Sequence, residues 1–216
     1  MEDFIFVHIP RTGGETIEIL LGVKKNHYHI RHKGLRSYES TFSFVRNPYT
    51  RLYSWYSHLR IPLYINEIEL TGLNEQSDTF RLAKGRVFDL GIHSELALKH
   101  SFNDWVKIMM SDKIKYTEAN DTTRNHMDSI NGPLTPCRDY LRDKDGKLII
   151  GDIYYFENYN EELAKLFTKI DRKDLIPKIE VTNQSKKPVP GEISEETKEM
   201  IYDHFRIDFT AFGYEK

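Results

Sequence analysis

The chain has 216 residues, which suit one large α/β domain with a substantial core. Its 31 Lys and Arg residues nearly balance 33 Asp and Glu residues, and the net charge of −2 gives no global reason to expect a nucleic-acid or membrane partner. One cysteine excludes an intramolecular disulfide framework, no apolar run approaches the roughly 20 residues of a membrane span, and the acidic N-terminus is unlike a signal peptide, so we expect a cytoplasmic protein.

The first predicted strand leads directly into a glycine turn. An apolar run of six residues, 4–9, is too short for a buried helix and predicts a strand covered on both faces. After Pro10 the turn 11–14 follows, with an arginine at its mouth and two consecutive glycines, and 15–21 predicts the start of an amphipathic helix. Such a turn typically holds phosphate, because backbone N–H groups and the helix dipole attract an anion. An ordinary strand-to-helix turn is the alternative, since two glycines fit that as well.

The next elements continue the alternation of strands and helices. A basic, histidine-rich connector occupies 24–33, and 34–40 is compatible with a short helix. Residues 41–45 are β-branched and aromatic and predict a second strand. An N-cap asparagine and a proline then precede a helix that we place at 49–58. This helix carries a core-facing stripe of Leu52, Trp55, Tyr56 and Leu59.

The remaining chain adds further strands and helices. The segment 61–134 matches no simple pattern apart from predicted helices at 79–84 and 102–111. Beyond it we expect a hairpin around the Asp-Gly pair of 143–146, a strand at 153–156 and a helix at 160–170. A short strand at 179–181 and a loop at 182–191 should follow. The chain should end with a helix from 195 to about 205, capped by Ser194, and an aromatic tail of Phe209, Phe212 and Tyr214 that packs on the body. Buried strands that alternate with helices predict a single α/β domain, with a central, mostly parallel sheet flanked by helices on both faces.

Two of the predicted strands end in an arginine. Arg11 follows the first strand and Arg46 the second, and open parallel sheets bind ligands at the carboxyl ends of their strands. Two arginines at one edge imply two anionic groups, or one ligand with two separated phosphates. Thr16 and Ser54 are placed to add hydroxyl groups. The alternative for Arg46 is a salt bridge or a brace for its own loop, and Arg51 is better placed as a brace.

The first turn is not a Walker A motif. That motif needs a lysine directly after its last glycine, whereas Glu15 follows Gly14 here and the basic residue precedes the glycines. The dinucleotide fingerprint G-x-G-x-x-G is absent from the sequence as well. We therefore expect a phosphorylated ligand other than ATP bound in the usual way.

Motifs along the whole chain resemble those of the sulfotransferase superfamily, most closely its carbohydrate branch of Golgi-type and bacterial enzymes. In family order they are 9–16 (Ile-Pro-Arg-Thr-Gly-Gly-Glu-Thr), 44–54, 155–158, 181–185 and 208–214. The most specific of them is the Arg-x₇-Ser spacing of Arg46 and Ser54. The resemblance implies one sulfotransferase domain over 1–216 with a P-loop-kinase-like fold, 3′-phosphoadenosine 5′-phosphosulfate (PAPS) as sulfuryl donor, and a variable, acceptor-binding insertion at about 61–135.

The resemblance also implies roles for residues at matching positions. The 5′-phosphosulfate loop would use backbone amides and one hydroxyl of Arg11, Thr12, Gly13, Gly14, Glu15 and Thr16. Arg46 and Ser54 would hold the 3′-phosphate, and the loop that contains Ser185 and Lys186 would lie near the nucleotide. The family usually has lysine where this chain has Arg11. Arginine keeps the charge that assists the departing phosphate, but its geometry differs.

A proton acceptor is expected between the two phosphate motifs. Transfer to an alcohol requires removal of its proton, a task that suits histidine. Relatives in the carbohydrate branch often carry a histidine base in this stretch, so we favour His32 and then His29, with Glu39 as a weaker alternative. The three histidines at 27, 29 and 32 would also fit a metal site or a solvated surface. No cysteine or carboxylate has matching spacing and the reaction needs no metal, so we expect none.

Other conspicuous side chains are interpreted as structural. His8 lies in a predicted strand and is expected to be a hydrogen-bonded core histidine. Trp55, Tyr56 and Tyr53 fit the core and a cleft wall better than an adenine platform, although Tyr53 fits either. Cys137 has no histidine partner in a recognisable motif and is interpreted as inert.

Together these inferences predict a PAPS-dependent sulfotransferase that acts on a hydroxyl, with a carbohydrate as the favoured acceptor, by direct in-line transfer. His32 would take the proton, Arg11 would neutralise the leaving phosphate, and Arg46 with Ser54 would anchor the nucleotide. Two alternatives stay open: a nucleotide-kinase-like phosphotransferase, and a non-catalytic module that binds a nucleotide or an anionic glycan.

Overall fold

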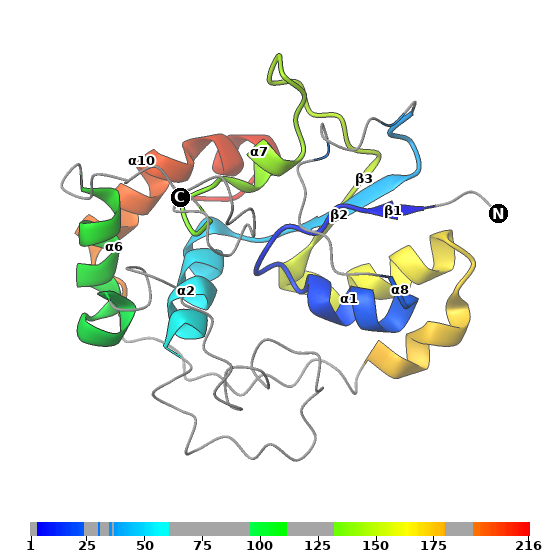
Figure 1. Cartoon of the computed structure of the whole chain (residues 1–216), viewed down its shortest axis with the longest axis horizontal. Coiled ribbons are helices and arrows are strands. Elements are labelled where there is room, and N and C mark those ends of the chain that lie inside the picture. The colour runs from blue at the N-terminus through cyan, green and yellow to red at the C-terminus, as the bar shows by residue number, and fades with distance from the viewer. Residues whose placement is uncertain are drawn as a thin grey trace, which may run out of the picture. The chain divides into compact units, whose positions relative to one another are not determined.

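The computed structural model describes residues 4–23, 30, 35, 37–60, 96–111, 132–179 and 192–216 (Figure 1). The chain divides into two compact units. The first comprises Met1–Arg51, Thr135–Lys186 and Phe205–Lys216, and the second comprises Leu52–Leu134 and Lys187–His204. The single domain over 1–216, with an acceptor-binding insertion, stays a prediction.

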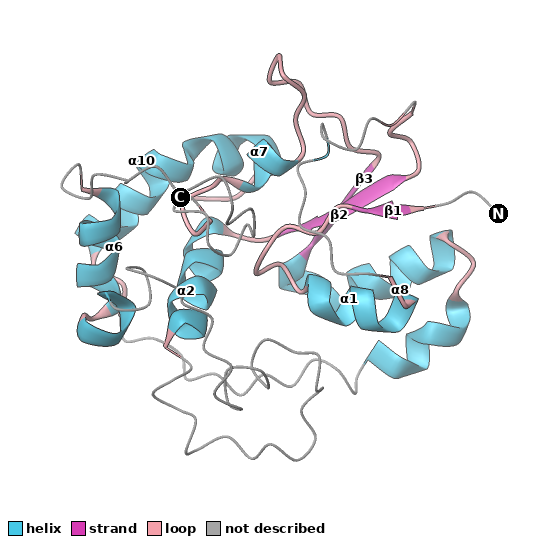
Figure 2. Cartoon of the chain, in the orientation of Figure 1, coloured by secondary structure: helices cyan, strands magenta, loops and turns pink. Residues whose placement is uncertain are grey.

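The first unit is built on a parallel sheet with the strand order β1-β2-β3 (Figure 2). The strands are β1 (Ile5–Phe6), β2 (Thr41–Val45) and β3 (Asp152–Tyr155). The bounds of β2 are those predicted, and β3 lies one residue earlier than predicted. β1 is shorter than the predicted run of six residues, although a 2.8 Å hydrogen bond from Val7 N to Phe42 O continues its pairing with β2. The predicted α/β class with a parallel sheet is confirmed.

Helices pack on one face of this sheet. They cover the apolar side chains of every second strand residue, which point to that face. The helices are α1 (Gly14–Leu21) and α8 (Tyr159–Lys169), both close to their predicted bounds, and they lie on the same side of the strands in Figure 1. The core that they share with the sheet consists of Phe6, Ile17, Phe42, Phe44, Tyr154, Tyr159, Leu163, Leu166, Phe167, Leu175 and Ile179.

The opposite face of the sheet has its own core. It contains Val7, Ile9, Ile30, Val45, Leu141, two residues of the short helix α7 (Cys137–Tyr140), and Phe212 near the end of α10 (Glu195–Phe212). The aromatic tail packs on the body as predicted. The ring centroids of Tyr214 and Tyr155 lie 6.0 Å apart, and those of Phe209 and Tyr49 lie 5.2 Å apart. Helices on both faces are thus confirmed for the first unit.

In the second unit, aromatic side chains join the helices. They come from the later part of α2 (Pro48–Leu59) and from α6 (Phe102–Met110), two helices that the sequence predicted. The ring of Tyr56 lies 5.5 Å from that of Trp105, and Tyr53 meets Phe102 edge-on at 5.2 Å. Trp55 is 1% exposed. These rings form a core, which confirms the structural interpretation of Trp55 and Tyr56.

The last helix begins as predicted but continues further. Ser194 caps α10, since its hydroxyl accepts a 3.3 Å hydrogen bond from Thr197 N. We predicted an end near Phe205, where φ of −100° and ψ of 17° interrupt the helix, but helical structure resumes and extends to Phe212. Among the described residues, no helix has both the length and the apolar character needed to cross a membrane.

Two predicted elements are wrong where the structure describes them. Residues 37–40 form turns rather than the end of a helix, because Thr41 N donates a 3.0 Å hydrogen bond to Tyr38 O and starts β2. Ile179 is helical rather than the start of a strand, and follows the 3₁₀ helix η3 (Lys173–Lys178). Its side chain is buried in the core of the α8 face, and this burial overrides the local β-propensity.

The predicted hairpin is present in a shorter form. Arg142 and Leu148 form an antiparallel bridge around the Asp-Gly turn. The segment before it contributes α7 instead of a longer strand, and this helix is capped by the Asp208 carboxylate, which accepts hydrogen bonds of 2.7 Å and 2.9 Å from Cys137 N and Arg138 N. The helix predicted at 79–84 lies outside the described residues.

Candidate active site

The loop between β1 and α1 has an uncommon backbone conformation. Arg11 has a φ of 70° and Gly13 a φ of 86°, both in the left-handed region. That region costs a non-glycine residue roughly 1–2 kcal/mol, so the surroundings of Arg11 must hold it there. Gly13 precedes the first residue of α1, and the first N–H groups of a helix have no acceptor within it. The loop therefore presents N–H groups and the positive end of a helix dipole, as an anion requires.

Close packing explains both glycines of the loop. A Cβ atom on Gly13 would lie 2.6 Å from the ring of Tyr159, and one on Gly14 would lie 2.1 Å from the ring of His8. His8 is 4% exposed and its Nδ1 lies 2.7 Å from Glu18 Oε1, so it is the hydrogen-bonded core histidine that we predicted. The sequence motif Gly-Gly thus reflects contacts with two aromatic rings as well as turn geometry.

Four side chains donate hydrogen bonds to carbonyl groups in and next to the loop. The donor and acceptor pairs are Thr12 Oγ1 to Ile9 O (2.8 Å), Arg51 Nε to Pro10 O (3.1 Å), Arg46 Nη1 to Arg11 O (3.3 Å) and the Tyr159 hydroxyl to Gly13 O (2.5 Å). Their donors come from the loop itself, from the residue that follows β2, from α2 and from α8. These bonds hold the backbone in its left-handed path.

The structure confirms the prediction that Arg51 is a brace. Its side chain is 1% exposed, and besides Pro10 O it binds Thr135 O, at 2.9 Å from Nη1. The carbonyl that it holds belongs to the loop after β1, rather than to the loop that precedes its own helix. Arg51 therefore links the candidate phosphate loop to the residue at which the chain returns to the first unit.

Arg46 lies beside Arg11, as the prediction of a shared sheet edge requires. Its guanidinium carbon lies 4.1 Å above the ring centroid of Phe156, and its Nε donates to Thr50 Oγ1 at 3.0 Å. Burial, together with the nearby charge of Arg11, lowers the pKa of Arg46 to about 10, while the charge of Glu157 opposes this shift. Arg46 is therefore charged at neutral pH but crowded by another cation.

Glu157 is a carboxylate whose charge acts on Arg46. It follows β3 in η2 (Phe156–Asn158), and its two oxygens accept a 2.7 Å bond from Asn47 N and a 3.1 Å bond from the Tyr214 hydroxyl. Burial, followed by the charge of Glu157, raises the pKa of Tyr214, so its hydroxyl stays a donor. Asn47 also caps α2, with its Oδ1 accepting from Tyr49 N at 3.0 Å, which confirms the predicted N-cap.

The amino-acid sequence matches the model of a known family. The family model described as Sulfotransferase family matches residues 2–215. The chain belongs to the sulfotransferase family. No curated protein and no solved structure gives a significant match to it. Membership supports sulfuryl transfer as the reaction and a hydroxyl as the acceptor group, in agreement with the resemblance that the motifs carry.

The other predicted binding residues of this sulfotransferase lie partly within the described chain. Glu15 and Thr16 stand in the first turn of α1, where Glu15 is exposed and Thr16 half-buried. Ser54 is a buried residue of α2. Ser185 and Lys186 lie outside the described residues.

The favoured bases, His32 and His29, also lie outside the described residues. Glu39, the weaker alternative, stands before the amino end of β2, whereas Arg46 follows its carboxyl end. At about 3.3 Å per residue this places the two roughly 20 Å apart along the strand, which argues against Glu39 as the base. Among the residues that the structure describes, no His, Cys, Asp or Glu side chains form a group that could hold a metal ion.

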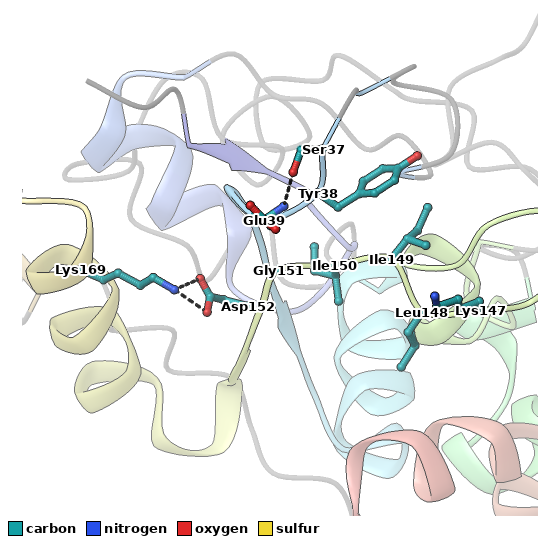
Figure 3. Close-up of a pocket in the computed structure, with 10 residues that line it drawn as sticks. All are labelled: Ser37, Tyr38, Glu39, Lys147, Leu148, Ile149, Ile150, Gly151, Asp152 and Lys169. Carbon is teal, nitrogen blue, oxygen red and sulfur yellow. Dashed lines mark hydrogen bonds and ion pairs between the residues drawn. The ribbon is translucent and has the colours of Figure 1, made fainter.

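Glu39 lines a pocket of about 570 Å³ at that amino edge (Figure 3). The pocket is open, and its charged pair is already satisfied, because Lys169 Nζ contacts both carboxylate oxygens of Asp152, at 2.7 Å and 2.5 Å. Figure 3 shows Glu39 on the strand side of the pocket and Lys169 reaching toward Asp152 from α8. This pocket is therefore separate from the arginines of the carboxyl edge.

Cys137 is buried, and burial raises the pKa of its thiol to about 12. A thiol with such a pKa is protonated at neutral pH and is a poor nucleophile. This agrees with our interpretation of Cys137 as inert.

Sequence reasoning missed the contribution of Tyr159 and assigned no role to Glu157. Glu157 stands in a motif that resembles the family, so its position after β3 was a usable signal. Tyr159 contacts a loop 146 residues earlier in the chain, and no local pattern points to that contact.

Proposed function

We propose that this sulfotransferase uses PAPS as its donor and transfers the sulfuryl group to a hydroxyl of a carbohydrate by in-line displacement. The 5′-phosphate of the donor would lie against the amides of Gly13, Gly14 and Glu15, with the Thr16 hydroxyl beside it. The residues present fit such a group, because α1 begins at Gly14 and its first N–H groups have no acceptor within the helix.

The crowding of Arg46 by Arg11 is the observation that carries this proposal. Two guanidinium groups are held near each other at one sheet edge, and the charge of Arg11 contributes to the lowered pKa of Arg46. A ligand with two phosphate groups would offset this repulsion, because its negative charges attract both guanidinium groups. Arg46, with Ser54 as the resemblance implies, would bind the 3′-phosphate, which distinguishes PAPS from ordinary 5′-nucleotides.

The chemistry requires two tasks of the protein. As the acceptor oxygen bonds to sulfur and the bond from sulfur to the phosphate oxygen breaks, negative charge develops on the leaving phosphate. Arg11 and the loop amides would stabilise that charge. His32, or His29 after it, would accept the hydroxyl proton as general base. The segment 61–135 would contribute the acceptor site, and the carbohydrate acceptor rests on the resemblance of the motifs to the carbohydrate branch.

Binding of adenosine 3′,5′-bisphosphate tests the donor assignment. We expect the purified protein to bind this compound far more tightly than 5′-AMP in titration calorimetry, because only the bisphosphate engages Arg46. His32→Ala should leave this binding unchanged and lower turnover with labelled PAPS in a panel of glycan acceptors. Equal affinity for the two nucleotides would contradict the 3′-phosphate assignment, and a fully active His32→Ala would move the base to His29.

A non-catalytic nucleotide-binding module is the second candidate, and Arg11 is the feature that favours it. Arginine replaces the lysine usual in the family, and its backbone is held in a left-handed conformation. Sulfate transfer from PAPS to any acceptor in the panel would exclude this candidate. Magnesium-dependent consumption of ATP would instead favour the phosphotransferase alternative.

A further inference from the structure

Tyr159, the first residue of α8, lies directly against the candidate phosphate loop. Its ring occupies the space that a Cβ on Gly13 would need, and its hydroxyl donates to Gly13 O. The ring is fixed from two other sides, with centroid distances of 5.2 Å to both Phe44 and Phe156. A phenylalanine would fill this space equally well, so packing alone does not require the hydroxyl.

The hydroxyl determines the direction of a backbone N–H group. In a planar trans peptide the C=O and the following N–H point to opposite sides. Since Tyr159 holds the carbonyl of Gly13, the N–H of Gly14 points away from Tyr159. Gly14 is the first residue of α1, so its N–H has no acceptor within the helix. The bond thus directs one of the amides that an anion would use.

The same hydroxyl also contacts Thr16. Burial raises the pKa of Tyr159, and a hydrogen bond from the Thr16 side chain opposes that rise. The tyrosine hydroxyl is therefore protonated at neutral pH, donates its one hydrogen to Gly13 O, and accepts from Thr16. One group that lines the loop, the Gly14 amide, is thus directed by Tyr159, whereas the Thr16 hydroxyl, which has a single hydrogen, would have to turn away from Tyr159 to donate to a phosphate.

We propose that Tyr159 is a positioning residue for the 5′-phosphate of the donor, acting through the Gly13–Gly14 peptide. This inference rests on the proposed function, since it presumes that a phosphate occupies the loop. Tyr159 itself touches the loop backbone from α8 and would not contact the reacting atoms.

Tyr159→Phe tests the proposal, with Tyr154→Phe as a matched control. Tyr154 is buried and stacks on the same Phe44 at 5.3 Å, but its hydroxyl makes no hydrogen bond to any residue that the structure describes. Affinities would be measured by calorimetry for adenosine 3′,5′-bisphosphate and for adenosine 3′-monophosphate, which lacks the 5′-phosphate. We expect Tyr159→Phe to bind the bisphosphate about tenfold more weakly and the 3′-monophosphate as the wild type does, and Tyr154→Phe to change neither.

A second measurement needs no ligand. Amide exchange at Gly14, followed by NMR in the free protein, should be about tenfold faster in Tyr159→Phe, because the Gly13–Gly14 peptide loses its anchor. A wild type that does not bind the bisphosphate would contradict the proposed function, while this exchange still tests the positioning role.

Three results would overturn the positioning role. They are unchanged bisphosphate affinity in Tyr159→Phe, equal weakening of both nucleotides, which would indicate general damage, and unchanged exchange at Gly14.

Discussion

The two edges of the parallel sheet in the first unit carry charge in different ways. At the amino edge, Lys169 and Asp152 form an exposed, bidentate ion pair beside an open pocket. At the carboxyl edge, Arg11 and Arg46 lie near each other, and the charge of Glu157 only partly opposes the lowering of the Arg46 pKa by burial and by Arg11. Ion pairs at a surface are nearly neutral in energy, whereas buried like charges repel.

The difference indicates which edge would gain more from binding an anion. An edge whose charges are paired gains little from binding an anion, because the anion must compete with an existing carboxylate. An edge with two guanidinium groups and a helix N-terminus gains directly, since the anion offsets repulsion that is built into the fold. The backbone supports the same distinction, because the loop of the carboxyl edge is held in a strained conformation by four side chains.

Among the substitutions that test the contrast between the two edges, we expect the largest effect from Gly14→Ala. The new Cβ would lie 2.1 Å from the His8 ring, so the loop must shift, and we expect about 3 kcal/mol loss of stability and roughly 100-fold lower turnover. Gly22→Ala, at the other end of α1, is the control. It meets no atom within 4 Å and should cost about 1 kcal/mol, through its φ of 66° alone, with turnover unchanged. Urea denaturation and initial rates measure both effects, and a fully active Gly14→Ala would contradict the loop assignment.

A second comparison removes one cation from each edge. Arg46→Ala should weaken binding of adenosine 3′,5′-bisphosphate by roughly 10- to 100-fold, because a charged hydrogen-bonding partner of the ligand is lost. Lys169→Ala should leave this affinity unchanged and lower the free energy of unfolding by at most about 1 kcal/mol, as expected for a surface pair. Calorimetry separates the two, and equal losses of affinity would show that only general charge matters.

Removal of one acid from each edge should sharpen the contrast. Glu157→Gln keeps an acceptor for Asn47 N but removes the charge beside Arg46, so we expect about threefold to tenfold tighter binding of the bisphosphate. Glu39 lies roughly 20 Å from Arg46 by strand length, beyond the screening distance at physiological salt. Glu39→Gln should therefore leave the affinity for the bisphosphate unchanged. The gain from Glu157→Gln should shrink at high salt. Weaker binding by this variant would mean that the carboxylate mainly holds the end of α2.

The smallest effect is expected at Cys137. Its pKa is raised to about 12, so the folded thiol stays protonated at pH 8 and should not react with a disulfide reagent, whereas the unfolded thiol should react at once. Between pH 9 and 12 the unfolded state releases this proton and the folded state keeps it, so the group lowers stability as pH rises. Thiol labelling with and without urea measures the first effect, and labelling of the folded protein would contradict it.

Much of the carboxyl edge was predictable from short stretches of sequence. The apolar run before Arg11, the β-branched run before Arg46 and the Asn-Pro start of α2 are local signals, and each element has the predicted type. Because parallel strands end at one edge, these signals also predicted that the two arginines meet there, which is confirmed. Local signals failed where burial decided the conformation, as at Ile179, which packs into the α8 core as part of a helix.

The sequence by itself determined the family, the parallel sheet and the arginines that follow its strands, because each of these depends on motifs that are about a dozen residues long or shorter. Only the tertiary structure decided which side chains hold the loop in place. Arg51 reaches Pro10 from 41 residues away, and Tyr159 reaches Gly13 from 146 residues away. The physical reason is that a hydrogen bond depends on position in space, and packing of α2 and α8 brings these donors to a loop that the sequence alone does not connect to them.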